Sequence, residues 1–364
     1  MEIKTYKNTE NFLECCEEPV KYNLGNESRV DDYINETDPL GKYIKYKASH
    51  TDLLDSGYEK GKEFTRRLLE DNGYEKLHDC DGSSDETTEG LILDIYEKLW
   101  GWTKTYNNFG KVKCLKFKCY FGADTLNSMQ HTLNDIVREL IKKEEYKLLS
   151  AKKSKRAATS IRYVVELYAD GNTRELFKKA IYSVENLKEN LRLHNTIGGF
   201  GLVPSGFNAF RGCNGTIRDY MDLSLMYLLE KGWGSRFNPG GSGIADYYRY
   251  INYFFLWDYV DKLGRPIVLL NRANNEIKNK EEYLRKIARI VDRRGKFMVA
   301  MLRLHKEIGE SSYREIREGI LAKDDRVYSG YGEAIESIRG HLGDRLTHET
   351  KGMLDNTIAR IGEA

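Results

Sequence analysis

The residues best suited to chemistry lie in one glycine-rich stretch, residues 194–212, between two segments with helical periodicity. Five glycines in these nineteen residues indicate that the backbone needs positive φ or close approach at several points. Arg211 supplies a planar, positively charged guanidinium group, and the start of a helix near Thr216 offers free backbone N–H groups. Both kinds of group bind phosphate or carboxylate ligands. We therefore predict an anion-binding site made of His194, Asn195, Thr196, Asn208 and Arg211.

A divalent-metal site is the alternative for the same region. Asp219 and Asp222 lie three residues apart on one helical face, and with His194 or Asn208 they could gather a divalent cation. Such a cation could activate water for phosphodiester cleavage. Asp219 equally suits a helix cap, and Asp222 suits an ion pair with Arg218, so both interpretations stay open. The sequence predicts no cofactor. A divalent cation is expected only if the metal-site alternative is correct.

The sequence contains no complete catalytic signature. It has no G-x-x-x-x-G-K-[ST], H-E-x-x-H or G-x-S-x-G, and Gly199-Phe200-Gly201 is not followed by the third glycine of a dinucleotide loop. The acidic stretch 79–90 has Ser84 where a calcium loop needs glycine. The six cysteines lack the C-x2-C pairs of zinc sites. We therefore assign no enzymatic activity from motifs.

Residues 247–259 are unusually aromatic. Tyrosine and tryptophan at this density suit a protein interface, while core packing with satisfied hydroxyl groups is the competing interpretation. The interface hypothesis assigns a partner surface to Tyr247, Tyr250, Tyr253 and Trp257.

The spacing of apolar residues predicts an α+β protein, predominantly helical with a small β element around residues 111–121. In that element, residues 115, 117, 119 and 121 alternate with Lys116 and Lys118, which is typical of a half-buried strand. Asp124 or Thr125 is expected to cap the next helix. The predicted helices cover about residues 53–70, 89–102, 125–149, 172–193, 216–228, 246–262, 281–306, 312–322 and 333–361, and a short strand is expected at 266–270.

The length of 364 residues predicts more than one structural unit. We divide the chain into an N-terminal variable region (1–85), a central helix-rich domain with glycine loops (86–275) and a C-terminal helical region (276–364). The acidic loop at 79–86 marks the first boundary.

Composition narrows the class of partner. Lys and Arg number 58 against 56 Asp and Glu, so the net charge of +2 creates no overall field toward nucleic acid or an anionic membrane. A local basic cluster at 142–156 leaves contact with nucleic acid open. The N-terminus predicts no secretory signal, the longest apolar run is too short to span a bilayer, and the sparse cysteines fit a reducing compartment. We expect a cytoplasmic protein without membrane contact.

Several spaced motifs resemble an uncharacterised family of bacterial and prophage-encoded proteins. They include Leu93-x-x-Tyr96-x-x-Leu99-Trp100, Thr196-Ile197-Gly198-Gly199, Asn208-x-x-Arg211-Gly212 and Tyr250-x-x-Tyr253-Phe254-Phe255. The resemblance covers roughly residues 89–300 and is most specific at Thr196–Gly199. It implies an intracellular protein from a phage or mobile element, where such proteins block or assist host defence, and it brings no activity.

Three hypotheses follow. The leading one is a protein-interaction module. Its expected partner is a host protein, a bacterial defence complex, and it is also expected to self-associate into a homo-oligomer. The second is a metal-dependent enzyme acting on nucleotides or nucleic acid. The third is a nucleotide-sensing protein that binds its ligand without turnover.

Overall fold

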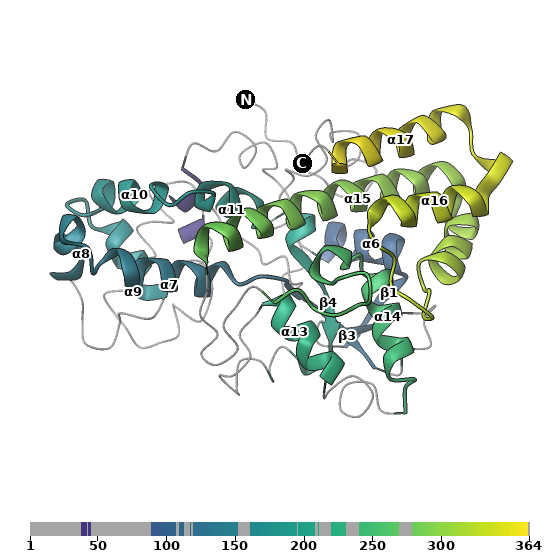
Figure 1. Cartoon of the computed structure of the whole chain (residues 1–364), viewed down its shortest axis with the longest axis horizontal. Helices are drawn as coiled ribbons and strands as arrows, with labels where there is room; N and C mark the ends of the chain where they lie inside the picture. The colour runs from purple at the N-terminus through teal and green to yellow at the C-terminus, as the bar shows by residue number, and fades with distance from the viewer. Residues whose placement is uncertain are drawn as a thin grey trace.

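The computed structural model describes residues 38–41, 43–44, 89–106, 109–112, 117, 119–151, 161–194, 196–207, 210, 220–230, 240–268 and 279–362. Helices predominate, and a small antiparallel sheet accompanies them, so the predicted fold class is confirmed (Figure 1). The α-helices are α6 (Glu89–Trp100), α7 (Met129–Leu140), α8 (Lys147–Ala151), α9 (Ile161–Ala169), α10 (Arg174–Tyr182), α11 (Leu187–Leu193), α13 (Met221–Tyr227), α14 (Ile244–Tyr253), α15 (Lys280–Glu315), α16 (Tyr331–Leu342) and α17 (His348–Gly362). The short helical turns are η1 (Glu144–Tyr146), η2 (Ile197–Gly199), η4 (Trp257–Tyr259), η5 (Ile316–Ile320) and η6 (Gly343–Arg345).

The sheet has four strands in the order β1-β2-β3-β4, and all neighbours are antiparallel. Its strands are β1 (Trp102–Tyr106), β2 (Phe109–Val112), β3 (Phe121–Thr125) and β4 (Phe200–Pro204). The single strand expected over 111–121 is wrong, because β2 ends at Val112 and β3 begins only at Phe121. Of the residues between them, 117, 119 and 120 are not in strands, and 113–116 and 118 lie outside the described residues.

Helix α7 begins later than expected. Asp124 and Thr125 belong to β3, and Ser128 caps the helix by accepting a hydrogen bond from the His131 backbone N–H at 3.3 Å. Local capping chemistry is the same for Ser and Asp, so the sequence alone does not separate these candidates. The strand pairing of β3 with β4 decides which residue becomes the cap.

Other predicted helices are interrupted by turns. The helix expected to reach residue 193 breaks into α10 and α11 at Asn186, which has a positive φ of 60°. The helix expected over 333–361 is divided into α16 and α17 by η6. The strand expected at 266–270 is reduced to one bridge between Val260 and Pro266, with 269–270 outside the described residues.

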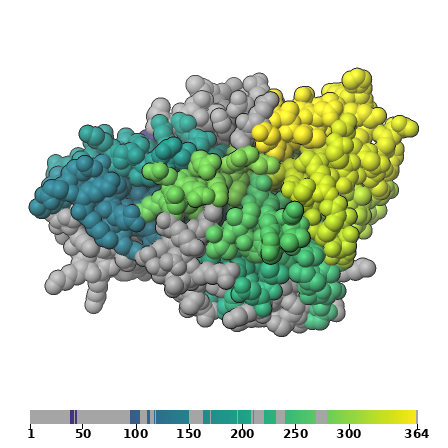
Figure 2. Space-filling model, in the orientation of Figure 1, coloured from purple at the N-terminus to yellow at the C-terminus, as the bar shows by residue number. Residues whose placement is uncertain are grey.

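Helix α15 runs along the long axis through the middle of the molecule and is kinked at Gly309, which has a φ of 76° (Figure 1). It packs against α6, α11, η2 and α17. Buried apolar side chains from Leu40 to Ile361 form one hydrophobic cluster, to which all three predicted regions contribute. The space-filling view shows the described central and C-terminal parts in contact with each other (Figure 2). None of the helices in the described ranges has an apolar run long enough to cross a bilayer.

The Thr-Ile-Gly-Gly segment is fixed to α15 by a fully buried arginine. The Nη1 group of Arg294 donates to the carbonyl oxygens of Ile197 at 3.3 Å, Gly198 at 3.0 Å and Phe200. Its Nε and Nη2 groups donate to the carbonyl of Phe254 at 3.2 and 3.1 Å. These bonds compensate for the desolvation of the guanidinium group and join the segment to both α14 and α15.

The glycines of this segment permit direct backbone contact with α15. A Cβ atom on Gly198 would lie 2.0 Å from the carbonyl oxygen of Val291 and 2.8 Å from the backbone nitrogen of Gly295. A Cβ atom on Gly199 would lie 2.6 Å from the carbonyl oxygen of His194. The glycines are therefore required by close packing within the chain.

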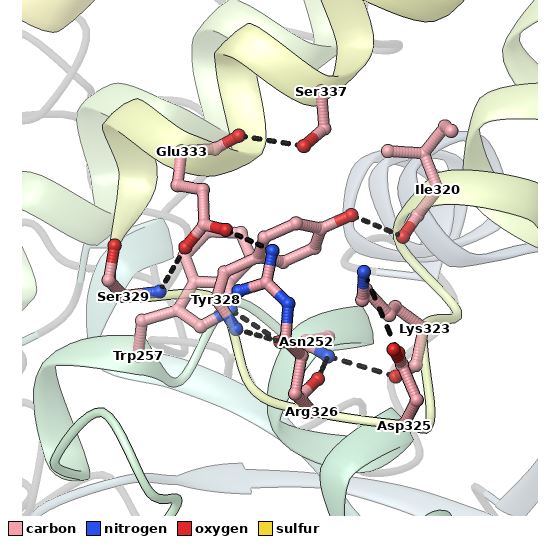
Figure 3. A network of polar contacts seen from close by, with 10 residues as sticks. All are labelled: Asn252, Trp257, Ile320, Lys323, Asp325, Arg326, Tyr328, Ser329, Glu333 and Ser337. Carbon is pink, nitrogen blue, oxygen red and sulfur yellow. Dashed lines mark hydrogen bonds and ion pairs between the residues drawn. The ribbon is translucent and has the colours of Figure 1, made fainter.

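Asn252 in α14 organises the loop between η5 and α16 (Figure 3). Its Nδ2 group donates to the carbonyl oxygens of Lys323 and Arg326 at 2.9 and 2.8 Å. Its Oδ1 atom accepts from Trp257 Nε1 at 2.9 Å and from the Tyr328 backbone N–H at 3.0 Å. All four hydrogen-bonding positions of this buried amide are satisfied, and η4 is held in place as a result.

An ion pair closes the same loop on the outside (Figure 3). Arg326 donates to the carboxylate of Glu333, and the Ser329 backbone N–H donates to it at 2.7 Å. The hydrogen bond from Arg326 lowers the pKa of Glu333 to about 2. The pair therefore stays ionised at neutral and mildly acidic pH.

We predict that G198A destabilises the protein strongly, because the added methyl group meets backbone atoms of α15 that cannot move alone. The expected loss in the free energy of unfolding is about 1–3 kcal/mol, measured by urea denaturation. G340A in α16 is the matched control, because its Cβ would meet none of the residues that the structure describes within 4 Å. That variant should be neutral or gain up to about 1 kcal/mol. Equal stability of the two variants would contradict the packing argument.

Candidate functional site

The predicted anion site is only partly described by the structure. Asn195, Asn208 and Arg211 lie outside the described residues, as does Asp219 of the alternative metal pair. His194 and Thr196 are described, and both are buried. The imidazole of His194 packs edge-on against Tyr43 with ring centroids 5.3 Å apart, and the Thr196 hydroxyl donates to the carbonyl of Leu193 at 2.7 Å. Both side chains thus have structural contacts within the chain.

The cavity beside His194 is very small. Its volume is about 20 Å³, and Val291 and Ile287 of α15 form one side of it. A cavity of this size holds about one water molecule. Among the described residues, α15 therefore packs close to His194 and Thr196, and the anion site remains a prediction because Asn195, Asn208 and Arg211 lie outside them.

The aromatic residues assigned to an interface belong to the core. Tyr247, Tyr250, Tyr253 and Trp257 are each at most 3 % exposed. Their polar atoms donate hydrogen bonds within the chain. The Tyr247 hydroxyl donates to the carbonyl of Gly264, the Tyr250 hydroxyl to that of Leu202, and the Tyr253 hydroxyl to that of Trp100. Trp257 Nε1 donates to the amide oxygen of Asn252. The interface hypothesis is therefore wrong for these four side chains, and the competing core interpretation describes them.

Asp222, the remaining member of the predicted metal pair, lies in the first turn of α13 and is buried. Together with η4 and α15 it forms a surface groove of about 230 Å³, which we call the α13–α15 groove. The lining residues are Asp222, Asp258, Tyr259, Ile267, Lys286, Ile287, Arg289, Ile290 and Arg293.

Helix α15 supplies the cationic side of the α13–α15 groove. Lys286, Arg289 and Arg293 recur at spacings of three and four, which places them on one helical face. Lys286 pairs with Glu282 at 2.7 Å, and Arg293 Nε lies 3.4 Å from Asp258 Oδ2. The exposed side chain of Arg289 is positioned to meet an anion that enters the groove.

Asp258 is the electrostatically unusual member of the groove. Burial raises the pKa of its carboxyl group, and the positive charges of Arg293 and Arg289 offset this only in part. Within the described part of the chain, Asp258 Oδ2 and Arg293 Nε are both buried and have no hydrogen-bond partner. These two atoms face each other in the half-buried Asp258–Arg293 ion pair, so their charges are paired although they form no hydrogen bond.

A wall of side chains separates the groove from the small cavity beside His194. Ile287 lines both spaces. Asn127, on the cavity side, donates from Nδ2 to the hydroxyl of Tyr259, on the groove side, at 2.6 Å. The described part of the glycine bend therefore lies behind the groove, on the other side of Ile287 and the Asn127–Tyr259 hydrogen bond.

The described residues include no group of three His, Cys, Asp or Glu side chains arranged to hold a metal ion. Asp222 meets Asp258 and three cations in the groove, and this environment suits an organic ligand with charges of both signs. The metal alternative also involves Asp219, on which the structure gives no information.

Sequence reasoning identified Asp222 but missed Asp258, Arg289 and Arg293. Two signals were present. Asp258 is the one charged residue in the apolar and aromatic run 250–260, and the cations at 286, 289 and 293 share a helical face. Neither signal showed that the two segments meet.

Comparisons with models of known protein families, with curated proteins and with solved structures find no match for this chain. The resemblance to an uncharacterised bacterial and prophage-encoded family therefore stays a prediction.

We predict that D258N stabilises the free protein at neutral pH. The folded protein binds the Asp258 proton more tightly than the unfolded chain does, so its stability falls as pH rises from the ordinary aspartate pKa through the raised folded pKa. Removal of the charge should raise Tm at pH 7, and by less as pH approaches 4.

The measurement is differential scanning calorimetry across this pH range, with D344N at an exposed position as the control. The control should leave Tm unchanged at every pH. A loss of stability in D258N at pH 7 would show that the ionised carboxylate is needed for folding and would contradict the argument.

Proposed function

We propose that the protein binds a nucleotide in the α13–α15 groove without turning it over. The observation that carries the proposal is the meeting of two carboxyl groups, the buried Asp222 and the half-buried Asp258, with the cations of α15 around one groove. Of the three sequence-based hypotheses, this corresponds to the nucleotide-sensing protein.

The chemistry of the lining matches the parts of a nucleotide. Carboxylates accept hydrogen bonds from the N–H groups of a base, and guanidinium groups bind phosphate oxygens in a bidentate manner. The side chains of Ile267, Ile287 and Ile290 offer apolar surface for the flat face of a base. A volume of about 230 Å³ accommodates the base and ribose, with the phosphates directed to the exposed Arg289.

The other two hypotheses receive less support. The interaction module was argued from an aromatic surface, and those side chains are in the core. The metal-dependent enzyme needs a third ligand near Asp222, and the described residues supply no such group. The expected defence-complex partner, homo-oligomer and cytoplasmic location remain predictions.

We predict that ribonucleotides raise the thermal midpoint of the protein, measured by differential scanning fluorimetry. A ligand at about one hundred times its Kd adds about 2.7 kcal/mol to the free energy of unfolding. Nucleosides and inorganic phosphate, which each offer half of the contacts, should shift Tm much less. Chromatography of the nucleotide after incubation should recover it intact.

R289A and D222N should remove most of this shift, because they take away the phosphate contact and a hydrogen-bond acceptor. R285A is the matched control, since Arg285 is exposed on α15 and does not line the groove. Circular dichroism establishes that each variant is folded. A ligand shift that survives in R289A and D222N would place the binding site elsewhere, and a converted nucleotide would favour the enzyme hypothesis.

A further inference from the structure

A second groove lies between α15 and α17, well along α15 from the first. Its volume is about 400 Å³, and it is defined here by Lys296 and Arg303 on α15 and by His348, Gly352, Met353 and Arg360 on α17. We call it the α15–α17 groove. Lys296, the residue of this set nearest the α13–α15 groove, is three positions beyond Arg293, and the two grooves share no lining residue.

The walls of this groove are fixed by packing. Helix α17 buries Leu354 and Ile361 against the core, and Lys296 Nζ donates to the carbonyl of Arg360 at 3.3 Å. Lys296 also pairs with Asp292 at 2.8 Å. The two helices therefore hold a set spacing, and the groove between them is a feature of the folded chain.

The groove is cationic at its edges and partly apolar at its base. Lys296, Arg303 and Arg360 face one carboxylate, Glu349. Met353 and Ala300 contribute apolar surface between these charges. Gly352 lies at the same place, and a Cβ atom there would meet none of the described residues within 4 Å, so the described part of the chain does not fill this space.

We propose that the α15–α17 groove binds an acidic amphipathic helix of a protein partner. The apolar side chains of such a helix would pack on Met353 and Gly352, and its carboxylates would pair with Arg303 and Arg360. The span from Lys296 to Arg303 is seven residues of α-helix, or about 10 Å, which matches roughly two turns of a bound helix.

Nucleic acid fits the same groove less well. No aromatic side chain lines it, whereas single-stranded nucleic acid is bound by stacking of bases on aromatic rings. An apolar base between cations matches an amphipathic peptide better than a phosphate backbone. The proposal does not depend on the nucleotide site.

The test uses a fluorescent peptide of about 16 residues, with Leu at helical spacing and Glu at the flanking positions. Binding to the full chain is measured by fluorescence anisotropy at about 50 and 300 mM NaCl. The same peptide with Lys in place of Glu and a single-stranded DNA of similar length are the comparison ligands. We expect the acidic peptide to bind at least about tenfold more tightly than either, and more weakly at high salt.

Two variants act through different physical changes. R303E/R360E reverses the charge of two lining residues, and G352F fills the groove with a side chain whose Cβ meets no atom of the described residues within 4 Å. Each should weaken peptide binding about tenfold or more, while R285E, on α15 but outside the groove, should not. Thermal melts identify any variant that fails to fold. If R303E/R360E does not fold, the binding measured for G352F decides the result.

Absence of binding by the acidic peptide would overturn the proposal, as would equal affinity in all variants. Tighter binding of the DNA than of the peptide would assign the groove to nucleic acid and would also overturn it. A failure here leaves the nucleotide site intact, because the thermal-shift experiment uses a different ligand and different variants.

Discussion

The structure depends on one buried cation. Arg294 is fully buried, and its five hydrogen bonds go to four carbonyl oxygens of η2, β4 and the end of α14. The ring of Trp100 at the end of α6 lies 5.7 Å from its guanidinium carbon. Burial lowers the pKa of Arg294, but a guanidinium group stays charged, so each of these carbonyls has a firm partner. Three segments far apart in sequence, the continuous stretch of η2 and β4, the end of α6 and the end of α14, thereby meet at one point of α15.

The position of α15 in turn sets both grooves. Lys286, Arg289 and Arg293 reach the α13–α15 groove just before Arg294, and Lys296 and Arg303 reach the α15–α17 groove just after it. The close contact between Gly198 and Val291 allows α15 to lie directly on the backbone of the bend. The Thr-Ile-Gly-Gly segment is thus the surface on which α15, the helix that carries the charged side chains, packs.

The sequence predicted the helices well where one face is continuously apolar, as in α6 and the first part of α15, because burial of such a face needs no knowledge of its partner. The prediction from sequence failed where contacts between distant segments determine the local structure. The alternation from Lys111 to Phe121 is genuine, yet its ends belong to different antiparallel strands, and alternation does not reveal a chain reversal. The tyrosines of α14 are buried because their hydroxyls reach carbonyls of β4 and α6, which no local pattern encodes.

The candidate site was likewise predictable only where local sequence determines it. The glycines of the bend correctly indicated a close approach, but sequence does not distinguish a ligand from another helix of the chain, and here the approaching atoms are those of Val291 and Gly295. Asp222 was identifiable by residue type. Its neighbours Asp258 and Arg289 are distant in the chain, and they meet it only because Arg294 fixes α15 in place.

Hydrogen exchange measured by mass spectrometry, with and without a saturating ribonucleotide, tests most directly whether the groove and not the bend receives the ligand. Peptides that contain Asp258 and residues 286–293 should become protected when the nucleotide binds. Peptides covering 196–204 should exchange slowly in both states, because Arg294 and α15 already hold that backbone. Rapid exchange at 196–204 in the free protein, lost on addition of nucleotide without change at Asp258, would contradict the account.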